Sequence, residues 1–146
     1  MNKQDLLNVL ADIFIPLGFK KKGNYLVKNE QSINTILHLQ KSQFSESFYL
    51  NYGYIMNSIP LDGLTMHVSS GLGSSNALEN QKIKEMLNLE NRMTDSEREH
   101  GFRKVILDNL VPKIESINSE EDIFNDLKKR STLNDIPLIV KEHFGL

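Results

Sequence analysis

Two neighbouring runs of the chain alternate between apolar and polar residues, and this alternation limits the fold more than any other feature. The first run carries its apolar set on one face, at Ile33, Thr35, Leu37 and Leu39. The second does so at Phe48, Leu50, Tyr52, Tyr54 and Met56. A period of two on both sides of a polar connection predicts an antiparallel hairpin. With both apolar sets on one face, we predict that Leu39 pairs with Phe48 and Leu37 with Leu50.

The remaining segments predict helices before and after this hairpin along the chain. The pattern predicts helices over 3–17, 77–90, 94–117, from 119 to about 130 and after Pro137, and strands over 24–29 and, more briefly, 64–68. We interpret Lys20–Lys22 as a turn and expect Pro112 to kink or split its helix. A helix, three or four consecutive strands and then several helices indicate a single α+β domain over 1–146, with helices on one face of an antiparallel meander.

The predicted helices and strands share one apolar core. Helical spacing brings apolar side chains to one stripe of each helix, and strand alternation brings them to one face of the sheet. The residues that we expect to find buried are Leu10, Phe14, Leu37, Leu39, Leu50, Tyr52, Phe102, Ile106, Leu110 and Phe124.

Composition excludes several classes of function. Lys plus Arg is 17 and Asp plus Glu is 19, a net charge of −2, whereas nucleic-acid-binding domains usually have a basic excess. With 0 Cys, thiol catalysis and cysteine-ligated metal sites are excluded. The chain has no apolar run of ~18–20 residues and no secretory signal, so we expect a cytoplasmic protein with neither membrane nor nucleic acid as partner.

Motifs for cofactors and catalysis are missing from the sequence. The four histidines have no metal-ligand spacing, and no serine lies in a nucleophile elbow. Gly71 and Gly73 precede a predicted helix, but the Gly-Lys of a phosphate-binding loop does not follow them. We therefore expect no metal, no cofactor and no catalytic residue of a familiar type.

Three segments resemble a known family. They read GFKKKGNY from Gly18, LHLQKS from Leu37 and FYLNYG from Phe48. Together they are similar to the bacterial family known only as domain of unknown function 4304, over roughly residues 5–130, with the clearest motif matches in 18–56. The resemblance implies an α+β fold and a bacterial setting, and it implies no activity.

The same segments supply the candidate site, which we expect near the end of the central sheet. Its residues are Lys22, His38, Gln40, Lys41 and Asn51. Amides both donate and accept hydrogen bonds, and lysine adds charge without fixed geometry, which suits recognition better than bond making. The alternative interpretation is a plain solvent-facing side of an antiparallel sheet.

These observations favour a non-enzymatic module that binds a protein partner. One such role is that of an immunity-type protein that neutralises a toxin, with the acidic helices around 95–99 and 120–126 facing a basic partner. The alternative is a small enzyme or ligand-binding domain that acts on an anionic or amide-bearing substrate at the polar sheet face. A deep pocket around the candidate residues favours the second hypothesis, and a flat face favours the first.

Overall fold

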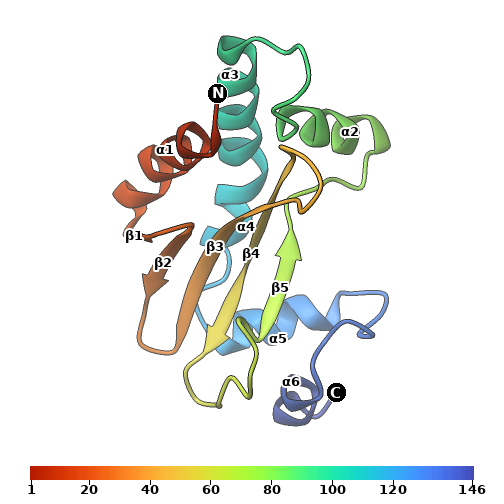
Figure 1. Cartoon of the computed structure of the whole chain (residues 1–146). Coiled ribbons are helices and arrows are strands. Elements are labelled where there is room, and N and C mark those ends of the chain that lie inside the picture. Colours follow the sequence, from red (N-terminus) through yellow and green to blue (C-terminus); the bar gives the residue numbers. More distant parts are fainter.

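The computed structural model describes residues 1–146, and its centre is one five-stranded antiparallel sheet (Figure 1). The strand order follows the chain, so the sheet is a simple meander. The strands are β1 (Lys20–Lys22), β2 (Tyr25–Asn29), β3 (Ile33–Lys41), β4 (Phe48–Met56) and β5 (Val68–Gly71). The predicted α+β class is confirmed, and the number of strands is five instead of three or four.

The two strands that the sequence pattern did not predict correctly lie at the edges of the sheet. Lys20–Lys22 is not a turn but the strand β1, which pairs with β2. All three of its lysines are exposed, so it carries no apolar alternation to reveal it. The short strand predicted at 64–68 lies further along the chain, at Val68–Gly71, where only Val68 is buried.

The register of the central hairpin differs from our prediction by two residues. Leu37 pairs with Tyr52 and Leu39 with Leu50, while Phe48 lies opposite Lys41. A shift of two leaves every side chain on its predicted face, so alternation alone does not distinguish the two registers. The connection distinguishes them, because Ser42 N–H donates to Ser47 O at 2.8 Å and closes the loop Gln43–Glu46 in the observed register.

All the helices that contribute to the core pack on one face of this sheet. They are α1 (Lys3–Phe14), α2 (Ala77–Met86), α3 (Asp95–Val105), α4 (Val111–Glu115), α5 (Glu120–Lys128) and α6 (Leu138–Phe144). Figure 1 shows the strands in front of α4 and α5. No helix of the chain has the length and apolar character needed to cross a membrane.

The first helix begins and ends at the residues that local chemistry favours. Asn2 accepts a hydrogen bond from Asp5 N–H, and the Asp5 side chain accepts one from Asn2 N–H, which forms a capping box. A short 3-10 turn follows at Ile15–Leu17 and ends at Gly18, whose φ of 100° suits a residue without a Cβ. The predicted helix 3–17 is therefore an α-helix that finishes in a tighter turn.

The helix predicted over 94–117 is divided at the place where proline interrupts it. Thr94 caps α3, and Ile106–Leu110 forms a π-helical turn before α4. Pro112 has no N–H to donate to the preceding turn, and Val111 N–H instead reaches back to Ile106 O. The wider turn accommodates the proline without ending the helical path.

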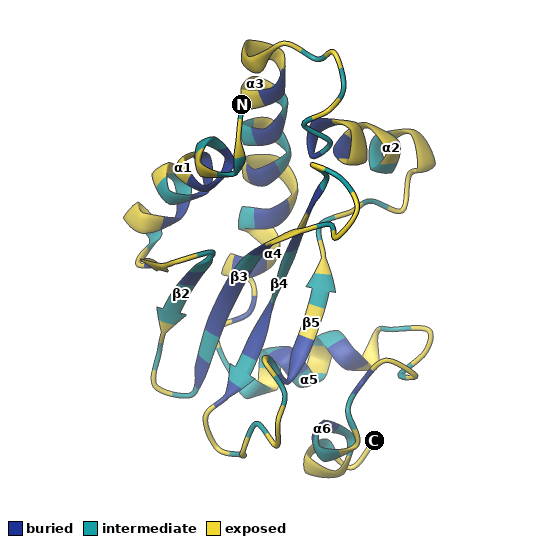
Figure 2. Cartoon of the chain, viewed as in Figure 1, coloured by how far each residue is buried: buried dark blue, intermediate teal, exposed yellow.

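Two apolar clusters fill the space between the sheet and the helices (Figure 2). The larger one joins α1, α3 and the middle of the sheet, and includes Phe14, Leu37 and Phe102. The smaller one joins α5 and α6 to Ile33 and Met56. Every residue that we expected in the core is buried except Tyr52 and Phe124, which are only partly buried. In α5 the buried positions are Ile123 and Leu127.

A buried arginine joins α2 to α3. Arg98 is 2% exposed, and its Nη1 donates to the backbone oxygens of Glu85, Met86 and Asn88, while its Nη2 donates to Asn91 Oδ1 at 2.6 Å. The guanidinium thus occupies the carboxyl end of α2, where carbonyl groups lack helical partners and a cation is favourable. Burial lowers the pKa of Arg98 from its ordinary value.

Candidate functional site

The sheet face opposite the helices carries a continuous row of side chains across four strands. The ladder pairs Lys22 with Tyr25, Tyr25 with His38, and His38 with Asn51. Residues paired in this way project to the same face of a sheet. The structure therefore aligns Lys22, His38 and Asn51, and it inserts Tyr25, which our sequence analysis missed, between the first two. We call this helix-free side the open face.

An aromatic stack fixes the middle of this row. The rings of Tyr25 and His38 lie 4.2 Å apart with an angle of 5° between their planes. Burial, together with the positive charge of Lys3, lowers the pKa of His38 below its ordinary value. The imidazole is therefore neutral at physiological pH, and it presents a ring and one N–H instead of a charge.

Gln40 and Asn51 form a pair next to this stack. Asn51 Nδ2 donates to Gln40 Oε1 at 2.9 Å. Tyr49 lies opposite Gln40 and leaves 54% of its surface exposed. These neighbouring polar groups come from the adjacent strands β3 and β4, as expected from their alternation.

Lys41 does not belong to this group. Lys41 follows Gln40 in β3, so its side chain projects to the other side of the sheet, opposite buried Phe48. Its ammonium pairs with Glu46 at 2.9 Å. Its ion partner comes from the loop between β3 and β4, which the strand pattern does not describe. Of the five candidate residues, the structure thus brings four to the open face and directs Lys41 elsewhere.

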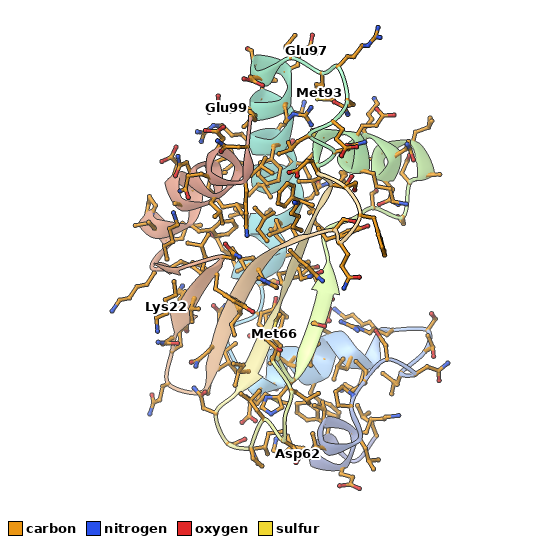
Figure 3. The ribbon with its side chains drawn as sticks, viewed as in Figure 1. Lys22, Asp62, Met66, Met93, Glu97 and Glu99 are labelled. Atoms are coloured by element: carbon orange, nitrogen blue, oxygen red, sulfur yellow. The ribbon has the colours of Figure 1, made fainter.

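The lower part of the open face is covered by the chain that leads into β5. A Cβ on Gly53 would meet Val68 O at 2.0 Å and Met66 Sδ at 2.8 Å, so only glycine lets β5 approach this closely. Met66 lies over this part of the sheet (Figure 3). Ile36, which pairs with Gly53, is consequently 7% exposed although it points away from the helices. The accessible part of the open face is the end that holds the row of Lys22, Tyr25, His38 and Asn51.

The charged side chains of the sheet are all positive. None of the five strands contains Asp or Glu, so all 19 acidic residues lie in helices and loops. On the open face the register places Lys20 and Lys22, whereas Lys21 projects to the opposite side. This face therefore combines neutral hydrogen-bonding groups with positive charge.

The acidic helices, in contrast, use many of their carboxylates internally. Asp95 binds the amino terminus at 2.8 Å, and Glu99 binds Arg103 at 3.0 Å. In α5, Asp126 binds Lys113 at 3.0 Å and Asp122 accepts the Asn118 N–H at 2.9 Å. Part of the negative charge of these helices is thus balanced by ion pairs within the molecule.

The open face offers hydrogen-bonding amides, an aromatic stack and lysine charge. A general acid or base needs a group that orients it, and no strand supplies a carboxylate to His38. A cavity of about 410 Å³ beside this face is lined by Tyr49 and Asn51 but by neither His38 nor Gln40. No cluster of three or more His, Cys, Asp or Glu side chains is close enough to hold a metal ion.

Comparison with known proteins gives a match to a family model. A family model with the description "Domain of unknown function (DUF4304)" matches residues 10–116. No curated protein and no solved structure matches the chain. The matched segment runs from α1 to the residue after α4, so it contains the whole sheet and the open face.

Proposed function

The chain belongs to the DUF4304 family, and within it we propose that this protein is a non-enzymatic binding module of the bacterial cytoplasm. Its partner is another protein, and the contact surface is the accessible end of the open face. The observation that carries the proposal is the row Lys22, Tyr25, His38 and Asn51, which crosses four strands without a covering helix and without an acidic residue.

The character of this row indicates the chemistry of the partner. Lys20 and Lys22 attract an acidic surface, tolerate a neutral one and would repel a basic one. The flat stack of Tyr25 and His38 supplies contact area with little conformational freedom to lose, as aromatic groups do at many interfaces. Gln40 and Tyr49 add hydrogen-bonding groups at the edge.

An immunity-type role, in which the protein neutralises a toxin, is one form of this proposal. The sequence suggested that acidic helices would face a basic toxin. The internal pairing of Asp95, Glu99 and Asp126 leaves those helices less charge to offer. We therefore propose that a toxin of this kind is held by the open face and presents a neutral or acidic surface there.

The alternative of a small enzyme at the same face has less support. It requires a pocket around His38, Gln40 and Asn51 and a second group to activate the imidazole. The cavity contacts Asn51 alone among these three, and Gln40 is engaged by Asn51.

Site-specific photo-crosslinking tests the proposal. A photoreactive phenylalanine analogue replaces Tyr49 on the open face, and in a matched protein it replaces Leu138, an exposed residue of α6 that is 68% accessible. The proteins are irradiated in bacterial cells of the natural source, and adducts are identified by mass spectrometry. We expect a discrete adduct to one protein from position 49 and none from position 138.

A variant at the other end of the row makes the test specific. Lys22→Glu replaces one positive charge of the open face with a negative charge and is expected to abolish the adduct formed from position 49. Lys21→Glu makes the same change one residue away, on the other side of β1, and is expected to preserve it. Equal adducts from both positions, or no adduct at 49, would reject the open face as the binding surface.

A further inference from the structure

The exposed edge of β4 is completed by two separate segments that do not meet. On one side, Leu72 N–H donates to Leu50 O at 2.8 Å. On the other, Phe48 N–H donates to Leu87 O at 2.9 Å, and Leu89 N–H donates to Glu46 O at 3.0 Å. Both segments run antiparallel to β4.

Between these segments, one donor and one acceptor of β4 receive no backbone partner. Leu50 N–H does not donate to Leu72 O, and β5 ends one residue earlier, at Gly71. Leu87 N–H bonds to Ile83 O at the end of α2 and is not available to Phe48 O. Backbone groups in the interior of a protein are normally paired, so an open pair of this kind is a place where a ligand can bind.

A cavity of about 410 Å³ lies at this gap, between the start of β4 and α2. Its volume falls in the range of ordinary small-molecule sites. Leu50, Ile83 and Leu87 form apolar wall, and amide side chains contribute polar groups. The amides in its lining are Asn51, Asn80, Gln81 and Asn88.

The spacing of the open pair specifies a ligand. In a parallel ladder, a residue donates its N–H to the residue before its neighbour and accepts from the residue after it. Phe48 O and Leu50 N–H flank Tyr49 in this arrangement. We propose that the cavity binds one acylated amino-acid residue, as an N-acyl amino acid or as part of an extended peptide, aligned parallel to β4 with its side chain beside Tyr49. This site shares Tyr49 and Asn51 with the open face but includes neither Lys22 nor His38, and its argument does not rest on the proposed partner.

Titration with a minimal ligand, followed by NMR of the backbone amides, tests this inference. The probe is N-acetyl-L-leucine methylamide, which has one residue and two amide groups. We expect a saturable shift of the Leu50 amide with a Kd on the order of 1 mM, the scale for a ligand of about a dozen non-hydrogen atoms. N-acetyl-L-leucine, with a free carboxylate, shows whether a chain end binds better than an internal residue.

A second probe tests the bond to Phe48 O. Methylation of the leucine nitrogen removes the N–H that donates to Phe48 O in the parallel alignment, and the ligand is expected to bind at least about fivefold more weakly. Equal binding of the methylated probe would overturn the proposed alignment.

Two variants on the same helix provide the protein control. Gln81→Trp places an indole in the cavity lining and is expected to weaken binding at least about tenfold. Lys82→Trp changes the neighbouring exposed residue, which is outside the lining, and is expected to bind as the wild type does. Dispersed spectra of both proteins verify folding.

The inference is overturned if the Leu50 amide does not shift at 20 mM probe, a concentration about twentyfold above the expected Kd, or if both variants behave alike. Lys22→Glu leaves this site intact, so the outcome is separate from that of the partner test.

Discussion

A single buried atom shows how the core tolerates polarity. Tyr54 is only 5% exposed, and its hydroxyl is buried without a hydrogen-bond partner. Burial raises the pKa of this phenol well above its ordinary value, so it remains protonated. A buried hydroxyl without a partner reduces stability, because it has lost its bonds to water.

Tyr54→Phe therefore removes a cost without removing a contact. We expect its free energy of unfolding to lie within about 0.5 kcal/mol of the wild type or to rise by about 1 kcal/mol. Urea denaturation measures the difference. Tyr54→Ala, which removes the ring as well, is expected to lose about 3–5 kcal/mol and shows that the measurement is sensitive to this position. A loss of about 1 kcal/mol or more in Tyr54→Phe would mean that the hydroxyl is bonded.

His38 makes the folding stability of the protein depend on pH. Its pKa is lower in the folded chain than the ordinary 6.5, so the unfolded chain binds more protons as the pH falls through that value. Stability from this residue is complete at higher pH and is lost on acidification. We expect the wild type to lose more stability than His38→Gln between about pH 7.5 and about pH 5. An imidazole titration midpoint at or above 6.5, measured by NMR, would contradict the direction of this shift.

At the scale of elements, alternation predicted which residues share a face but not which residues are opposite one another. His38, Gln40 and Asn51 could be assigned to one face from the sequence because a strand has a period of two. The two-residue register shift depended on the loop closed by Ser42 and Ser47. The cavity depended on where α2 ends beside β4, which no local pattern encodes.

The end of α2 depends on Arg98. Replacing it with methionine leaves the backbone oxygens of Glu85, Met86 and Asn88 without their donor, so we expect a loss of about 2–4 kcal/mol. Arg98→Lys retains the charge but not the fork of donors, and is expected to recover only part of the loss. Arg92→Met, at an exposed arginine of the preceding loop, is the control and should change stability by less than about 0.5 kcal/mol. Similar losses in the two methionine variants, measured by thermal unfolding, would show that Arg98 does not anchor α2.

Two phenylalanines distinguish the interior of a helix layer from its margin. Phe102 of α3 is 0% exposed, and Phe102→Ala is expected to cost about 3–5 kcal/mol. Phe124 of α5, which we expected in the core, stacks at 5.0 Å on Phe144 and remains partly exposed. Phe124→Ala is therefore expected to cost about 1–2 kcal/mol in the same denaturation assay. An unchanged midpoint for Phe102→Ala would contradict its place in the core.

At the scale of the whole molecule, the acidic residues are found in the helices and loops and not in the strands of the sheet. The helices on one side contain acids, several of which form ion pairs within the chain, and the other side presents an acid-free sheet. The sequence allowed this face to be identified and grouped Lys41 with it at the end of the sheet, whereas the Lys41 side chain projects to the other side, opposite Phe48, and pairs with Glu46. The open face is centred on Lys22, Tyr25, His38 and Asn51.

The affinity of the crosslinked partner for two charge-reversed variants tests the central claim most directly. Isothermal titration calorimetry of the purified partner compares wild type, Lys22→Glu and Lys21→Glu. If the open face is the binding surface, Lys22→Glu weakens binding by at least about tenfold, while Lys21→Glu stays within about threefold. Equal affinities for the two variants, or a larger loss in Lys21→Glu, would contradict the account.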